Sequence, residues 1–148
     1  MTLNHWVEGS SPSEVTMRLF CLLFLLTGIT LPLNAQVFEL KPKEFLDRIK
    51  ENPGTQVLDL RDAEEYLHFH IPGAVNIQPA EEFFLEEVRD QLSASDTLFI
   101  YCRIGKTKEV ARLLLENGYR VIYNLKGGSV AWVEYLEKER RKGEKSGR

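Results

Sequence analysis

The chain has 148 residues, of which 43% are hydrophobic and 28% are charged. These values are typical of one globular domain that is large enough to bury a sizeable core. The formal net charge of −3 argues against a nucleic-acid-binding protein, which usually carries an excess of basic residues.

The first 35 residues form two segments that differ in composition. Residues 1–16 are polar and show no pattern, so we expect a disordered N-terminal extension. Residues 17–35 contain a basic residue, an apolar run and a small residue before a polar one. This is the pattern of a secretory signal peptide, with cleavage expected after Ala35. Translation from Met17 instead of Met1 would leave the signal peptide intact.

A membrane anchor is the alternative interpretation of the same apolar run. Gly28 and Pro32 interrupt it, and it is shorter than the ~20 apolar residues that a spanning helix needs. We therefore expect a cleaved signal and an exported domain, periplasmic or secreted, with no membrane attachment after cleavage. That domain would cover residues 36–137, followed by a charged tail at 138–148 that frays into solvent.

Short apolar runs alternate with segments of helical spacing along this domain. Strands are predicted at residues 37–40, 56–60, 74–77, 97–101 and 120–124. Helices are predicted at residues 42–52, 63–67, 81–92 and 108–116, and in a last segment for which Ser129 is the expected N-cap. This alternation indicates an α/β fold, a central parallel five-stranded sheet flanked by helices on both faces.

The segment between the fourth strand and the following helix carries the predicted chemistry. Cys102 stands where the strand ends, at the edge where an open α/β sheet holds its ligand crevice. The next helix contributes unpaired N–H groups and the positive end of its dipole, and Arg103 and Lys106 add positive charge. Gly105 permits a tight turn that directs successive N–H groups inward as an anion cradle. This setting favours a reactive thiolate over an inert buried thiol.

The other cysteine, Cys21, lies in the predicted signal peptide. Export would remove it and leave Cys102 as the only thiol, so no disulfide is expected within the mature chain. The sequence contains no Cys-x-x-Cys motif and no Cys/His cluster with ligand spacing. We therefore predict no metal site and no cofactor.

Four motifs, in this order along the chain, together resemble the single-domain rhodanese (thiosulfate sulfurtransferase-like) family. They are Asp59-Leu60-Arg61, the segment 70–77, the segment 101–107 and the segment 123–132. The resemblance extends over roughly residues 38–137 and implies a rhodanese-like fold. It also implies a sulfurtransferase, in which the loop cysteine takes the outer sulfur of a donor such as thiosulfate and holds it as a persulfide. An acceptor such as cyanide or a thiol then removes that sulfur.

The resemblance also implies roles for individual residues. Cys102 matches the nucleophile, and Arg61 matches the arginine that the family places beside the donor anion. The backbone N–H groups of the loop would hold the persulfide sulfur, which implicates Arg103, Ile104, Gly105, Lys106 and Thr107. From the residues alone, Arg61 is also a plausible structural ion-pair partner for Asp59 or Asp62.

Two positions depart from the family pattern. Phe69 precedes His70, where the family usually has glycine, and Ile104 occupies a loop position that is often polar or basic in members that use thiosulfate. Ile104 therefore leaves the identity of the donor open.

Three other functions stay open at this stage. A related group of phosphatases and arsenate reductases uses a loop one residue longer that ends in arginine, and Lys108 stands at that position here. A non-catalytic module that binds a partner or senses redox state is the second. The third is a sulfur carrier that serves a protein acceptor. The expected partners are a small sulfur-donor anion and a thiol or cyanide acceptor, with a protein acceptor as a further possibility.

Overall fold

The computed structural model describes residues 35–52 and 54–146. The predicted N-terminal extension and all of the predicted signal peptide except Ala35 lie outside these residues, and so does Cys21. Within the described ranges, none of the helices is long and apolar enough to cross a membrane.

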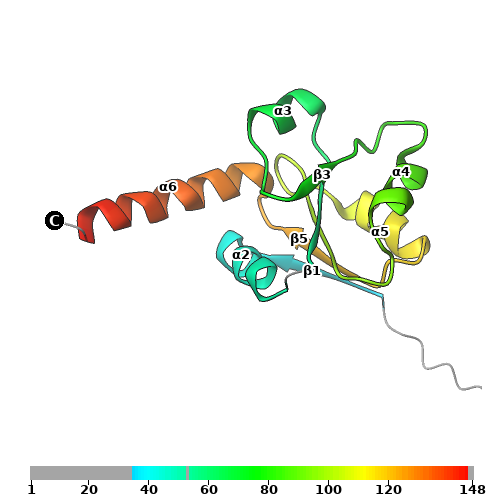
Figure 1. Ribbon diagram of the computed structural model, residues 1–148, viewed down its shortest axis with the longest axis horizontal. Helices are drawn as coiled ribbons and strands as arrows, with labels where there is room; N and C mark the ends of the chain where they lie inside the picture. Colours follow the sequence, from blue (N-terminus) through cyan, green and yellow to red (C-terminus); the bar gives the residue numbers. More distant parts are fainter. Residues whose placement is uncertain (1–34, 53, 147–148) are drawn as a thin grey trace, which may run out of the picture. The chain divides into compact units, whose positions relative to one another are not determined.

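The five predicted strands form one parallel sheet (Figure 1). They are β1 (Gln36–Leu40), β2 (Gln56–Asp59), β3 (Ala74–Asn76), β4 (Leu98–Tyr101) and β5 (Val121–Leu125). The strand order is β1-β5-β4-β2-β3, and every neighbouring pair is parallel. All four residues of β4 are buried because this strand lies at the centre of the sheet. The prediction of a central parallel sheet is confirmed.

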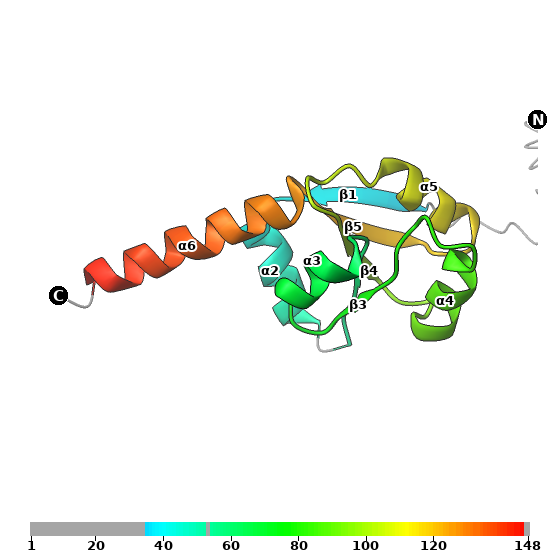
Figure 2. The ribbon, with the colours of Figure 1, turned by 90° about the horizontal axis from the view of Figure 1, so that it is seen from above.

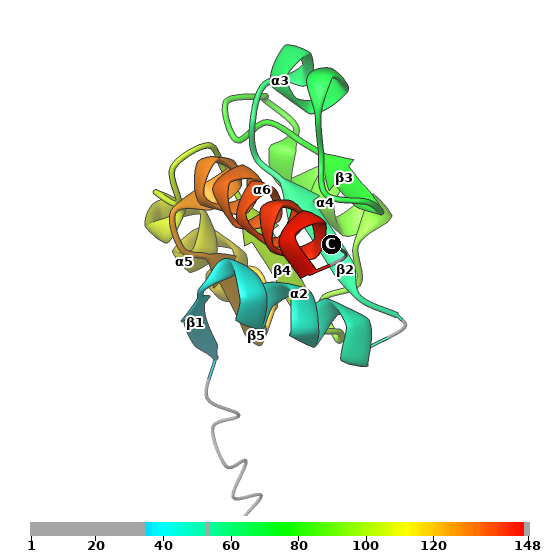
Figure 3. The ribbon, with the colours of Figure 1, turned by 90° about the vertical axis from the view of Figure 1, so that its left-hand side faces the viewer.

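Helices cover both faces of the sheet, as predicted. Their bounds are α2 (Pro42–Glu51), α3 (Ala63–His68), α4 (Phe84–Gln91), α5 (Lys108–Glu116) and α6 (Gly128–Ser146). Buried side chains of α4 and α5 form one core cluster with one face of the sheet, and those of α2 and α6 form a second cluster with the other face. Figure 3 shows α2 and α6 lying side by side.

The central strand contributes alternate side chains to the two clusters. Leu98 and Ile100 belong to the cluster of α4 and α5, whereas Phe99 and Tyr101 belong to that of α2 and α6. This alternation follows from the period of two along a strand. On the second face, the ring of Phe45 packs edge-on against Phe99, with the ring centroids 5.1 Å apart.

The C-terminal end of the domain differs from the prediction. The chain does not fray from Lys138 but continues as helix α6 to Ser146, beyond the sheet (Figures 1 and 2). Residues 137–146 are all exposed. Ion pairs one turn apart link Arg141 to Glu137 and Arg140 to Glu144, and such pairs stabilise an exposed helical segment.

We predict that Leu114→Ala destabilises the fold much more than the same change at its neighbour. Leu114 is fully buried in the first core cluster, whereas Leu113 is 36% exposed. Truncating a buried leucine costs about 2–5 kcal/mol through lost burial and a residual cavity. Leu113→Ala should cost less than about 1 kcal/mol. Urea unfolding monitored by circular dichroism measures both variants, and equal losses would contradict the assigned orientation of α5.

Candidate active-site loop

The predicted nucleophile lies at the C-terminal edge of the sheet. Cys102 directly follows Tyr101, the last residue of β4, and its side chain is half-buried against the core cluster of α4 and α5. The loop that starts at Cys102 ends at Thr107, and α5 begins at Lys108. The structure thus has the strand, loop and helix that the sequence predicts at this place.

The backbone of this loop presents a row of unused donors. Within the described residues, the N–H groups of Arg103, Ile104, Gly105 and Lys106 donate to no backbone or side-chain acceptor. Gly105 adopts a positive φ of 79°, which a residue with a side chain rarely adopts. Four successive free donors before a helix N-terminus are typical of a site that binds an anion or a thiolate.

Thr107 has a structural position at the end of the loop. It is buried, its N–H donates to Gly105 O (3.1 Å), and its carbonyl accepts from Ala111 N (2.8 Å) in the first turn of α5. Arg103, Ile104 and Lys106 instead point their side chains into solvent. Arg103 lies 3.5 Å from Glu65 of α3, whereas Lys106 has no carboxylate within ion-pair distance among the residues that the structure describes.

The turn between β5 and α6 holds the other side of the loop. The N–H of Ser129 donates to the Cys102 carbonyl (2.9 Å), and the N–H of Val130 donates to the Arg103 carbonyl (3.2 Å). Ser129 is therefore not the predicted N-cap, because α6 already begins at Gly128. The hydroxyl of Ser129 donates instead to the carbonyl of Arg103 (3.5 Å).

Close approach of backbone explains the glycines at Gly128, the first residue of α6, and at Gly105 in the loop. Gly128 has a φ of 62°, and a Cβ atom there would overlap the Cys102 carbonyl oxygen and lie 2.6 Å from the carbonyl carbon of Arg103. A Cβ atom on Gly105 would lie 2.8 Å from the backbone nitrogen of Gly127. The buried Asn124 of β5 adds a hydrogen bond from Nδ2 to Gly105 O (3.3 Å). The loop is thus held from β5 and α6 as well as from its own strand and helix.

Arg61 belongs to a buried network beside the loop. Its Nη2 lies 2.6 Å from Asp59 Oδ2 and 2.6 Å from the carbonyl oxygen of Phe69. Its Nε also donates to Asp59, and the guanidinium lies over the Tyr101 ring, 5.3 Å from the centroid. The structure therefore contains the ion pair with Asp59 that the sequence left open. Because Arg61 also lines a groove next to the loop, its role beside a donor anion stays a prediction.

The same network perturbs two ionisable groups. Burial raises the pKa of Tyr101, and so does the hydrogen bond that its hydroxyl donates to Asp59. Burial opposes the charged form of Arg61, but the hydrogen bond and the charge of Asp59 outweigh it, so that the pKa of Arg61 is raised. Arg61 is therefore a cation at neutral pH, like other arginines in proteins.

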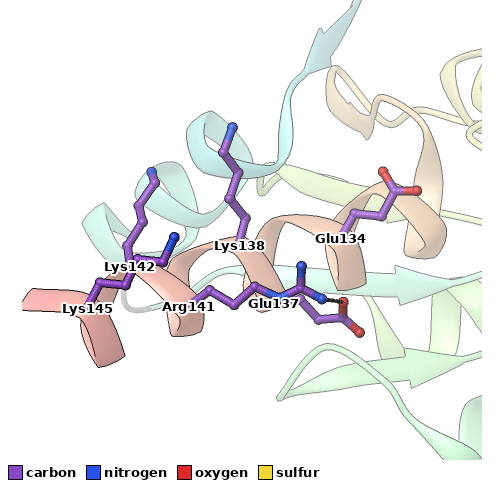
Figure 4. Close-up of a pocket in the computed structure, with 6 residues that line it drawn as sticks. All are labelled: Glu134, Glu137, Lys138, Arg141, Lys142 and Lys145. Carbon is purple, nitrogen blue, oxygen red and sulfur yellow. Dashed lines mark ion pairs between the residues drawn. The ribbon is translucent and has the colours of Figure 1, made fainter.

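Three hollows lie near the loop or along α6. The first, the α3–α6 groove, has a volume of about 670 Å³ and is lined partly by Arg61, Arg103 and Ser129. The second lies on the opposite side of the loop, between β1 and the start of α5, and includes Lys106. The third is a shallow hollow on the outer half of α6 whose six lining residues include no residue of the loop (Figure 4).

The sequence predicts the loop and offers Asp59 as a partner of Arg61, but it does not predict the supporting roles of Tyr101 and Asn124. Tyr101 bonds Asp59, and Asn124 bonds Gly105. Gly127-Gly128 is part of a family motif, but only the fold shows what the second glycine contacts. Within the described residues, no group of three or more His, Cys, Asp or Glu side chains is arranged to hold a metal ion.

Comparison with known proteins places the chain in one family. The family model of the rhodanese-like domain matches residues 41–135. The thiosulfate sulfurtransferase GlpE of Coxiella burnetii is 30% identical over 77 residues, which are 51% of this chain and 69% of that protein. The tRNA uridine(34) hydroxylase of Chlamydia caviae is 33% identical over 136 residues, which are 86% of this chain and 40% of that protein.

A solved structure agrees with the fold. The crystal structure of the Alr3790 protein from Anabaena has a TM-score of 0.57 to this chain at 26% sequence identity, and the match covers 65% of this chain and 77% of that one. The chain spans about half of the length, or less, of several curated relatives that it matches.

We predict that Gly128→Ala lowers the reactivity of Cys102, because the new Cβ displaces the Cys102 and Arg103 carbonyls and with them the loop donors. Alkylation by iodoacetamide at neutral pH should slow by about tenfold or more, since displacements of about 1 Å have effects of this size at reactive groups. Gly118→Ala is the matched control, because Gly118 also has a positive φ (99°) but nothing within 4 Å. Similar slowing in both variants would show that backbone strain alone is responsible.

We predict that Tyr101→Phe weakens the dependence of stability on alkaline pH. The unfolded chain ionises this tyrosine near its ordinary pKa of about 10, whereas the folded pKa is higher. The stabilisation is therefore complete below about pH 10 and is lost as the pH rises toward the folded pKa. Burial also raises the pKa of Tyr119, and the part of the pH dependence of stability that Tyr119 causes remains in both proteins.

Urea unfolding of wild type and Tyr101→Phe at several pH values between about 8 and 11 measures this difference. The variant should also lose about 1–3 kcal/mol at neutral pH, because Asp59 and Ile71 N lose their hydroxyl partner. Parallel loss of stability in both proteins above pH 10 would contradict the prediction.

Proposed function

Because the chain belongs to the rhodanese-like domain family, we propose that it is a sulfurtransferase with Cys102 as the nucleophile. In this proposal Cys102 takes a sulfane sulfur from thiosulfate or a similar anionic donor and passes it to a nucleophilic acceptor. The observation that carries the proposal is the row of free N–H donors in the loop that begins with the half-buried Cys102 and ends at the start of α5. Such donors stabilise the thiolate and the persulfide anion alike.

The first step exchanges one S–S bond for another. The Cys102 thiolate attacks the outer sulfur of thiosulfate, a bond forms between the two sulfur atoms, and the S–S bond of the donor breaks. Sulfite leaves with the electron pair, and Cys102 carries a persulfide anion. Two negative charges approach the loop in this step, so the exposed Lys106 and the positive end of α5 favour it electrostatically.

The second step returns the thiolate. The carbon of cyanide, or the sulfur of an acceptor thiolate, attacks the outer sulfur of the persulfide, and the S–S bond to Cys102 breaks toward Cys102. The products are thiocyanate, or an acceptor persulfide, and the free thiolate. Both steps balance without an external oxidant or reductant, which agrees with a site that needs no cofactor.

We assign Arg61 a supporting role in this proposal. Its Nε and Nη2 are used by Asp59 and by the Phe69 carbonyl, while no hydrogen bond from its Nη1 exists among the described residues. Since Arg61 lines the α3–α6 groove, that remaining nitrogen is the part of the side chain suited to a donor anion. Most of its charge is balanced by Asp59.

Phosphatase or arsenate reductase chemistry is the alternative that fits the loop less well. Such enzymes need an arginine at the end of the loop to bind a tetrahedral oxyanion through two N–H groups. Here α5 starts at that position with Lys108, which is exposed. Lysine lacks the planar fork that makes two-point binding possible. The hydroxylase named above shows that related chains also occur in proteins with other activities.

The location of the protein also remains a proposal. We propose export to the periplasm or the exterior, on the basis of the signal-peptide pattern of residues 17–35. In an oxidising compartment a single reactive thiol is exposed to sulfenic acid formation.

We predict that the protein gains one sulfur atom on Cys102 when incubated with thiosulfate, and that cyanide removes it. Intact-mass spectrometry followed by peptide mapping measures both steps. Cys102→Ser should keep its circular dichroism spectrum, because Cys102 is only half-buried, but gain no sulfur and produce no thiocyanate. Turnover by the serine variant would contradict the assignment of the nucleophile. A wild-type thiol that is free, alkylated rapidly and never loaded would contradict the proposed donor class.

A further inference from the structure

The α3–α6 groove has more apolar surface than a small inorganic donor needs. Phe69, Val130 and Val133 line it, and their side chains are 37%, 45% and 38% exposed. Thiosulfate and cyanide have no hydrocarbon surface to bury against such groups. Exposed apolar side chains gathered in one groove are typical of surfaces that bind other proteins.

Carboxylates from both helices surround this apolar surface. Asp62, Glu64 and Glu65 come from the start of α3, and Glu134 comes from α6. Two of them have local partners, since Asp62 accepts from the N–H of Glu65 and Glu65 pairs with Arg103. Glu64 and Glu134 are exposed and pair with no cation among residues 35–52 and 54–146. The groove is therefore acidic, because the charge of Arg61 is balanced by Asp59.

The groove opens directly beside the reactive loop. Arg103 and Ser129 form its wall, and the N–H of Ser129 holds the carbonyl of Cys102. An acceptor seated in the groove would therefore lie beside the loop that carries Cys102, whose neighbour Arg103 lines the groove while Cys102 itself packs against the first core cluster. The exposed carboxylates of the groove suit a cationic acceptor, whereas the donor anion is drawn to Lys106, the loop donors and the remaining nitrogen of the buried Arg61.

The outer half of α6 has the opposite charge. Figure 4 shows Lys138, Arg141, Lys142 and Lys145 along this part of the helix. Arg141 pairs with Glu137 and Lys142 with Glu139, whereas Lys138 and Lys145 pair with no carboxylate among the described residues. Together with Glu134 and Glu137, these cations line a hollow that contains none of the loop residues. A cationic acceptor would thus be attracted to the groove and repelled from the end of α6, which restricts how it can approach.

We propose that the α3–α6 groove docks the sulfur acceptor, and that this acceptor is a protein segment with a cysteine, apolar side chains and lysine or arginine residues. The inference rests on the proposed sulfurtransferase function. The apolar groups of the acceptor would pack on Phe69, Val130 and Val133, and its cations would pair with Glu64 and Glu134. The acceptor thiolate then attacks the outer sulfur of the Cys102 persulfide. One S–S bond forms on the acceptor, one breaks at Cys102, and the thiolate of Cys102 leaves with the electron pair.

The test measures the second step separately from the first. The purified protein is loaded with thiosulfate, the excess donor is removed, and loss of the persulfide is followed with two probe peptides. Each peptide has one cysteine and two leucines, and carries either three lysines or three glutamates. We expect the lysine peptide to discharge wild type about tenfold more efficiently at low ionic strength, and the preference to shrink at high salt.

Two double variants decide whether the groove causes this preference. Glu64→Lys with Glu134→Lys should abolish or invert it. Glu82→Lys with Glu86→Lys makes the same change in net charge beside and on α4, which packs on the other face of the sheet, and should preserve it. Each variant is compared through its own ratio of the two peptide rates, so that a general change in loading or stability cancels.

The outcomes distinguish a failure of the docking proposal from a failure of the proposed sulfurtransferase function. Equal discharge by the two peptides, or equal effects of the two double variants, would overturn the docking proposal while cyanide still discharges the wild-type persulfide. Failure of wild type to form a persulfide that cyanide removes would overturn the sulfurtransferase function itself. Circular dichroism of both double variants confirms that they are folded before their ratios are compared.

Discussion

The ion pair between Asp59 and Arg61 organises the edge of the sheet on which the candidate site stands. Both side chains are almost fully buried, so each charge depends on the other, and removing one would leave an uncompensated charge at a cost of about 3–5 kcal/mol. The pair also bonds the hydroxyl of Tyr101 and the carbonyl of Phe69. It therefore ties the end of β2 to the end of β4, directly before Cys102, and to the segment that follows α3.

A second constraint acts on the loop from the opposite side. The turn at Gly127-Gly128 brings the first N–H groups of α6 against the carbonyls of Cys102 and Arg103. With its carbonyls bonded outward in this way, the loop keeps its own N–H groups free. This division explains how one short segment can be rigid and still offer unused donors, a combination that preorganised anion sites require.

The charges around the loop are divided between its two sides. Lys106 and the start of α5 are positive, whereas the α3–α6 groove is lined by carboxylates. A site that meets an anionic donor first and a different acceptor second benefits from such an arrangement, because each reactant is attracted to a different side. Helix α6 connects the two functions, since its first turn holds the loop and its next turns form one wall of the groove.

The sequence by itself determined the order of strands and helices along the chain and the place of Cys102 at the end of a strand, because these follow from the periods of apolar residues and from local stop signals. Tertiary structure alone decided that Arg61 is paired with Asp59, that Ser129 bonds the loop instead of capping α6, and that α6 continues to Ser146. Arg61 and Asp59 are near neighbours in the chain, but Tyr101, 42 residues away, also bonds Asp59. Ser129 bonds the loop across 26 residues. Such long-range contacts leave no periodic signal. Charged residues after Lys138 are compatible with both a frayed end and a helix, and the structure shows the helix, in which opposite charges four residues apart form ion pairs.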